Sequence, residues 1–143
     1  MKYLITIFFI ACFTLQGKSV ENLDAVESKV DFLSSRTVVK YGYIGRARVY
    51  PEELKALWVI AKDPKSEEYF FKMTEKQNDY AKLYGLMGLK VIKSNKYDAV
   101  KTKLGKNNSN ITFFEGCVAS THSVSKMAEM ITKKDIPTPP KDK

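Results

Sequence analysis

Apolar residues recur at three- and four-residue steps along much of the chain, which is the spacing of amphipathic helices. Such helices are expected over residues 20–33, over residues 51–62 and over residues 64–73. The second begins at Pro51, whose missing amide hydrogen costs nothing in a first helical turn. It ends at Asp63, because a residue that precedes proline avoids the helical region. The spacing therefore predicts a helical hairpin in the first half of the chain.

Residues 80–92 are apolar on nearly all faces, which predicts a buried, central helix. Gly85 and Gly88 lie within it, and each would cost about 0.8–1.0 kcal/mol relative to alanine in an exposed helix. We therefore expect another helix to pack closely against them. A shorter helix follows over residues 97–104, so the pattern predicts a second helical hairpin.

Residues 111–119 are rich in β-branched and aromatic side chains and form the best candidate for a strand. Residues 37–45 mix β-branched residues with two glycines, which predicts a loop or a short irregular extended piece. A C-terminal helix is expected from a serine or threonine cap at 120–121 to about Ile131. Residues 133–143 are rich in proline and charge, which favours a disordered basic tail.

The two predicted hairpins carry similar patterns of large apolar side chains. The motifs are Leu54-x-x-Leu57-Trp58 and Tyr80-x-x-Leu83-Tyr84-Gly85-Leu86-x-Gly88-Leu89. From Pro51 to about Leu104 the chain resembles HEAT-like repeats, the αα-hairpins that stack into superhelices. The segment Tyr84 to Leu89, followed by a short helix and Gly116-Cys117, is similar to a group of small exported bacterial proteins. These resemblances imply a binding or structural role, and they imply no catalytic residue or ligand.

The expected fold is therefore mostly α. Two HEAT-like helical hairpins are flanked by an N-terminal helix, and one short extended segment and a C-terminal helix follow them. A single helical domain is expected over residues 18–132, between an N-terminal targeting segment and the tail over residues 133–143.

Residues 1–17 have the pattern of a secretory signal peptide, with one lysine ahead of a short apolar run. The run is shorter than the roughly 20 residues that span a bilayer, so no transmembrane span is predicted. The small residues Gly17 and Ser19 favour cleavage near Lys18 or Val20 and export to the periplasm or the cell exterior. In the alternative interpretation, Phe9-Ile-Ala-Cys12 is a lipobox, and Cys12 carries the lipid of a membrane-anchored lipoprotein.

The chain of 143 residues carries a formal net charge of +8, and lysine rather than arginine supplies most of its positive charge. Dispersed lysines do not favour specific nucleic-acid recognition, which uses the bidentate guanidinium group. The densest basic run predicts a helical face that attracts an anionic component of the cell envelope or an unidentified protein. Its members are Lys90, Lys93, Lys96, Lys101, Lys103 and Lys106.

One group of residues has possible chemistry, namely Glu115, Cys117 and His122. A catalytic thiol needs a base within hydrogen-bond reach and a third group that orients the base. These residues would meet only if the chain turned sharply after the strand. A structural zinc site needs four Cys or His ligands, so neither a metal nor another cofactor is predicted.

The functional prediction is an exported, non-catalytic helical protein that presents a surface for macromolecular interaction. The alternative is a thiol-dependent hydrolase or transferase that uses Cys117 and His122.

Overall fold

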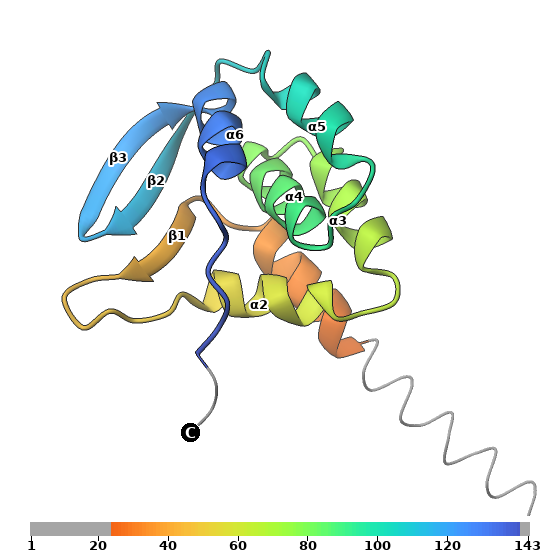
Figure 1. Cartoon of the computed structure of the whole chain (residues 1–143), viewed down its shortest axis with the longest axis horizontal. Helices are drawn as coiled ribbons and strands as arrows, with labels where there is room; N and C mark the ends of the chain where they lie inside the picture. The colour runs from red at the N-terminus through yellow and green to blue at the C-terminus, as the bar shows by residue number, and fades with distance from the viewer. Residues whose placement is uncertain (1–23, 141–143) are drawn as a thin grey trace, which may run out of the picture.

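The computed structural model describes residues 24–140, so the predicted signal peptide and Cys12 lie outside the described residues. Within residues 24–140 the chain forms six helices and a three-stranded sheet (Figure 1). The expectation of a mostly α fold with one short extended segment is therefore wrong, and the fold mixes α and β. The first helix ends at residue 34, and the elements after it are β1 (Val39–Ile44), α2 (Glu52–Ala61), α3 (Ser66–Thr74), α4 (Asp79–Val91), α5 (Tyr97–Leu104), β2 (Asn110–Gly116), β3 (Val118–Ser123) and α6 (Val124–Lys133).

The sheet has the order β1-β2-β3, with β1 parallel to β2 and β2 antiparallel to β3. The segment expected to be a loop or a short irregular extended piece forms β1, because Val39 and Tyr41 are buried on the core side of the sheet. Its two glycines have positive φ angles near the end of the strand, where the pairing with β2 shifts register. Its pairing in a sheet is not predicted from sequence because its partner β2 follows only after four intervening helices.

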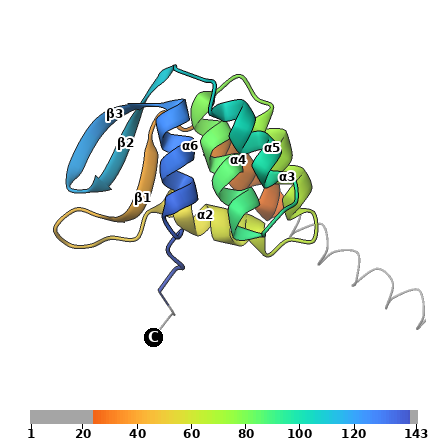
Figure 2. The ribbon, with the colours of Figure 1, turned by 45° about the horizontal axis from the view of Figure 1, so that its top comes forward.

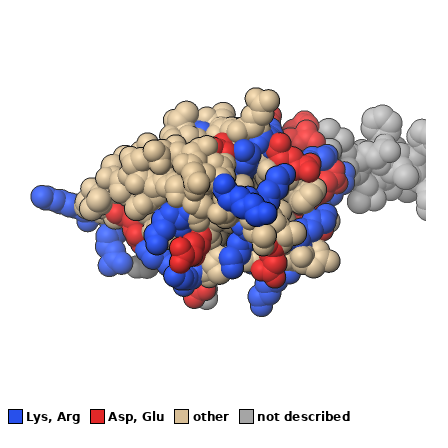
Figure 3. All heavy atoms as spheres, turned by 90° about the horizontal axis from the view of Figure 1, so that it is seen from above, with Lys and Arg blue, Asp and Glu red and all other residues tan. Residues whose placement is uncertain are grey.

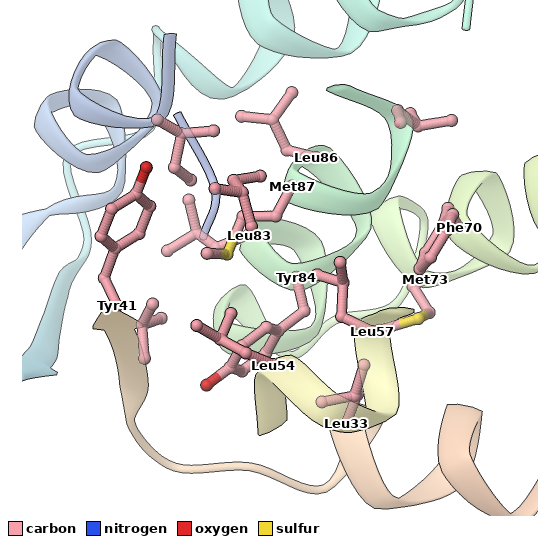
Figure 4. Packing of buried hydrophobic residues seen from close by; sticks show 14 of the residues in the cluster. Leu33, Tyr41, Leu54, Leu57, Phe70, Met73, Leu83, Tyr84, Leu86 and Met87 are labelled. Atoms are coloured by element: carbon pink, nitrogen blue, oxygen red, sulfur yellow. The ribbon is translucent and has the colours of Figure 1, made fainter. Parts of the chain in front are cut away.

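Helices α3 and α4 pack very closely, as the two glycines of α4 predict. A β carbon on Gly85 would lie 2.7 Å from the carbonyl oxygen of Phe70. A β carbon on Gly88 would lie 2.2 Å from the Phe70 ring. The structure also confirms that α4 is central, because the residues from Leu83 to Leu89 are all buried. Figure 4 shows these side chains meeting those of α2, α3 and β1 in one core.

Helix α6 lies between the sheet and α4, and so joins the two halves of the fold (Figure 2). Its apolar face, which contains Val124, Met127, Ala128 and Ile131, is buried. Ser123 caps its first turn by accepting a hydrogen bond from the amide of Lys126 at 3.2 Å.

The chain after α6 runs back across β1 and α2. Tyr41 donates a hydrogen bond to the Asp135 carbonyl at 2.6 Å. Tyr50 and Trp58 both donate to the Pro137 carbonyl, at 2.7 and 2.8 Å. Ile136 is buried between these contacts, so the first part of the segment expected to be disordered is held against the core. Burial raises the pKa of Tyr41 and of Tyr50 to about 12.

Candidate functional site

The structure keeps Cys117 and His122 apart. Cys117 is the exposed turn residue between β2 and β3. His122 pairs with Ile111 at the opposite end of the hairpin, and its ring lies 5.9 Å from the Phe113 ring. Because an extended strand advances about 3.3 Å per residue, the thiol has no contact with the imidazole.

Glu115 does not orient His122. Its carboxylate pairs with the ammonium group of Lys134 at 2.5 Å, at the tip end of the hairpin. His122 has a different neighbour, since its Nε2 lies 3.2 Å from the hydroxyl of Ser120. The geometry therefore gives no support to a catalytic thiol. Nowhere in residues 24–140 do three His, Cys, Asp or Glu side chains gather in a way that could hold a metal ion.

Two of the six lysines predicted to form a basic face make contacts within the protein instead. The ammonium group of Lys90 donates to the carbonyls of Ile131, Thr132 and Lys134 at the end of α6. Lys96 pairs with Glu67 at 3.0 Å and lies over an aromatic ring. Both are therefore engaged within the molecule.

The other four lysines have no acidic side chain within ion-pair distance among the described residues. Lys93 lies after α4 with a positive φ angle of 54°, apart from the others. Lys101 and Lys103 lie in the last turn of α5, and Lys106 follows shortly after it. The basic face that the sequence predicts is therefore concentrated at the end of α5.

A cleft of about 540 Å³ opens between this end of α5 and the start of α6. Two lysines, one from each helix, line it together with three hydroxyl groups and one carboxylate. The start of α6 also brings the positive end of the helix dipole to the cleft, which favours negatively charged ligands. The lining residues are Lys101, Thr102, Gly105, Ser123, Ser125, Lys126, Ala128 and Glu129.

The polar groups of the cleft keep some freedom to bind a ligand. Lys126 and Glu129 are both about half exposed, and their charged groups are 3.6 Å apart. The hydroxyl of Ser125 lies 2.9 Å from that of Ser123. An anionic group entering between the helices would meet Lys101 and Lys126 on opposite sides.

Sequence reasoning found only Lys101 among the charged residues of this cleft. It missed Lys126 because the β2–β3 hairpin separates α5 from α6 along the chain. The serine at position 123 is a recognisable helix cap, but its sequence context does not reveal which surface lies beside it.

A second cavity, of about 460 Å³, lies beside the start of α2, and sequence reasoning missed it. Glu53 is only 2% exposed at its floor and pairs with Lys40 at 3.0 Å and Arg36 at 3.7 Å. The two cations neutralise the carboxylate, which explains how a charged residue can be buried here. With Glu52 also in the lining, the charges of this cavity cancel, and we interpret the cluster as structural.

Within residues 24–140, none of the helices has the length and apolar character needed to cross a membrane. No protein-family model matches the chain, and a search among curated proteins finds no significant match.

Proposed function

We propose that this is an exported, non-catalytic protein that binds an anionic component of the cell envelope at the cleft between α5 and α6. The observation that carries the proposal is that Lys101 and Lys126 line one cleft edged by hydroxyl groups and the start of a helix, with Lys103 beside it in the last turn of α5. Ammonium groups attract phosphate and carboxylate groups over long range, and hydroxyl groups donate hydrogen bonds to these anions at contact.

The distribution of charge over the rest of the surface also favours the end of α5 as the place where anions bind. In Figure 3 blue side chains are numerous over the helices, while the part of the surface at upper left is almost free of charge. Many lysines elsewhere are paired with a neighbouring carboxylate, such as Lys55 with Glu52 and Lys72 with Glu68. Unpaired lysines at the end of α5 therefore give that region the stronger attraction for anions.

The test uses the mature protein and vesicles that contain phosphatidylglycerol, with vesicles of phosphatidylcholine alone as the neutral reference. Binding to the anionic vesicles is expected to fall steeply between low and physiological salt, where the Debye length shortens to about 8 Å. Each lysine near an anionic surface contributes about 1 kcal/mol. The triple change Lys101→Gln, Lys103→Gln and Lys106→Gln should therefore weaken binding about a hundredfold.

A matched control removes the same charge from the other end of the molecule. Lys55, Lys62 and Lys65 are exposed on or just after α2, which lies far from α5 in Figure 1. Their replacement by glutamine should weaken binding much less. Equal losses in the two triple variants would show that net charge alone drives association and that the cleft has no special part in it.

A further inference from the structure

Strand β3 is an edge of the sheet, and nothing covers it among the described residues. The sheet has the order β1-β2-β3, and Figures 1 and 2 show no element beyond β3 on its outer side. Edge strands are usually protected by charged side chains, proline or a bulge, because their free amide and carbonyl groups can pair with another strand. β3 has the sequence Val-Ala-Ser-Thr-His-Ser, which contains no charged carboxylate, lysine, arginine or proline.

The pairing with β2 identifies which backbone groups of β3 point outward. The amide of Val124 donates to the Ser109 carbonyl at 2.9 Å, so this pair is hydrogen-bonded. In an antiparallel pair, hydrogen-bonded and non-hydrogen-bonded positions alternate. Residues 118, 120 and 122 therefore bond to β2, whereas Ala119, Thr121 and Ser123 direct their amides to the open edge.

We propose that this edge binds a second copy of the chain, with β3 antiparallel to its symmetry mate and the two-fold axis at Thr121. Thr121 of each copy then donates to and accepts from Thr121 of the other. The amide of Ser123 donates to the Ala119 carbonyl of the partner copy. The carbonyl of Ser123 accepts a hydrogen bond within the first turn of α6. The two sheets join into one continuous sheet, and the contact is the same from both sides.

The side chains of β3 suit pairing with themselves. About this axis Ala119 lies opposite Ser123, Thr121 opposite itself, and Ser120 opposite His122. Each of these pairs is small or able to form a hydrogen bond, and a Thr–Thr pair across strands is favourable. Ala119 and Thr121 are exposed in the single chain, so no core side chain must move.

The distribution of charge allows two copies to meet at the hairpin. The protein has a net charge of +8, so two copies repel through most of their surfaces. Between Lys106 and Lys126 the only charged side chain is Glu115, and Lys134 neutralises it. The uncharged surface at upper left in Figure 3 is where the hairpin lies, and two copies can meet there without like-charge repulsion.

The first test measures the mass of the mature protein in solution by analytical ultracentrifugation over a wide range of concentration. The wild-type protein is expected to shift from monomer to dimer as the concentration rises. Thr121→Pro should remain monomeric, because proline lacks the outward amide and obstructs the approaching strand. The same substitution leaves the bonds to β2 intact, since the amide of Thr121 does not point toward β2. Thr121→Val, which keeps the amide and the β-branched shape, should still dimerise.

A second test does not depend on the folding of the proline variant. Residues directly opposite in a hydrogen-bonded antiparallel pair have Cα atoms about 5.5 Å apart, which suits a disulfide. In a Cys117→Ser background, Thr121→Cys should form a covalent dimer under mild oxidation. Thr112→Cys, exposed on the neighbouring strand β2, is the control and should not.

A wild-type protein that stays monomeric at every concentration overturns the proposal. So does a Thr121→Pro variant that folds and still dimerises, or a Thr112→Cys variant that cross-links as readily as Thr121→Cys. The proposal is independent of anion binding, because the vesicle experiment changes lysines of α5 and this experiment changes only the hairpin.

Discussion

The α3–α4 pair and the β2–β3 hairpin are packed in opposite ways, although only α5 separates them along the chain. In the helix pair, the backbones approach so closely that Phe70 occupies the space where a β carbon on Gly88 would lie. In the hairpin, the base is buried through Ile111 and Phe113, whereas the tip with Cys117 and Val118 is exposed. The close packing of the helices stabilises the fold and leaves their contact surface buried. The exposed tip of the hairpin leaves backbone and side chains free for contact with other molecules.

The change from buried to exposed residues falls within the hairpin itself. Phe113 is 3% exposed and its neighbour Phe114 is only partly buried. Adjacent residues of the hairpin therefore differ in how much they contribute to the core, and substitutions can measure that difference.

The largest effect is expected from Phe113→Ala. Removing a buried aromatic ring typically costs about 3–5 kcal/mol in the free energy of unfolding, because a cavity remains. Phe114→Ala, one residue along on the other face of the sheet, should cost clearly less. Urea denaturation of both variants measures the difference, and equal losses would mean that the core does not end at Phe113.

The next effect concerns the chain after α6. Ending the protein at Lys134 removes the buried Ile136 and the carbonyls that accept from Tyr41, Tyr50 and Trp58. We expect the free energy of unfolding to fall by about 2–4 kcal/mol. Burying a large aliphatic side chain contributes about 1.5–3 kcal/mol, and the entropy cost of ordering the segment offsets part of what the hydrogen bonds contribute. Ending it at Pro137 instead should leave the melting temperature nearly unchanged. If the shorter protein melts like the longer one, these contacts do not stabilise the fold.

Gly88→Ala tests the helix pair directly. Alanine gains about 1 kcal/mol in helix propensity, but its β carbon would collide with the fully buried ring of Phe70. We expect a net loss of about 1–3 kcal/mol from overpacking. Ala99→Gly, at an exposed position of α5, measures the propensity term alone. A Gly88→Ala protein that is more stable than the wild type would show that α3 and α4 can separate easily.

High pH should weaken the contact between the chain after α6 and the two tyrosines that hold it, Tyr41 of β1 and Tyr50 before α2. Tyr41 and Tyr50 ionise near pH 10 when unfolded, but burial raises their pKa in the folded protein to about 12. The folded state thus binds more protons between these values, and stability falls as pH rises from about 10 to 12. In Tyr41→Phe this decline should be shallower. Denaturant titrations at pH 9 and 11 give the comparison, and identical slopes in the two proteins would contradict it.

The smallest effect is expected at the hairpin tip. Cys117→Ser should change the free energy of unfolding by no more than about 0.5 kcal/mol, because the side chain is exposed. A thiol probe should react with the native protein about as fast as with the protein in urea. Strong acceleration in the native state would revive the catalytic-thiol hypothesis, and strong protection would mean that the tip is covered.

Helical spacing was sufficient to predict α2, α3, α4 and α6, because each buries a stripe that local sequence displays. It also predicted the role of Gly85, since glycine inside a buried helix needs a packing reason. The sheet could not be predicted in full. β1 depends on pairing with a strand that lies beyond four helices, and β3 is made of small polar residues with little intrinsic strand preference.

The candidate site was likewise predictable only in part. The cluster of lysines was visible, but their partners were not, so the structural roles of Lys90 and Lys96 and the contribution of Lys126 emerged only from the fold. Glu115, Cys117 and His122 are close in sequence, yet the extended hairpin separates His122 from the other two.

The parallel pairing of β1 with β2 also has a consequence for how the protein folds. Helices α2 to α5 lie between the two strands, so a long loop must close before their pairing returns any stability. Local contacts such as those of α3 with α4 form without that cost. We therefore expect the sheet to assemble late, leaving β1 unpaired until β2 arrives. Phe113→Ala should then speed unfolding far more than it slows folding.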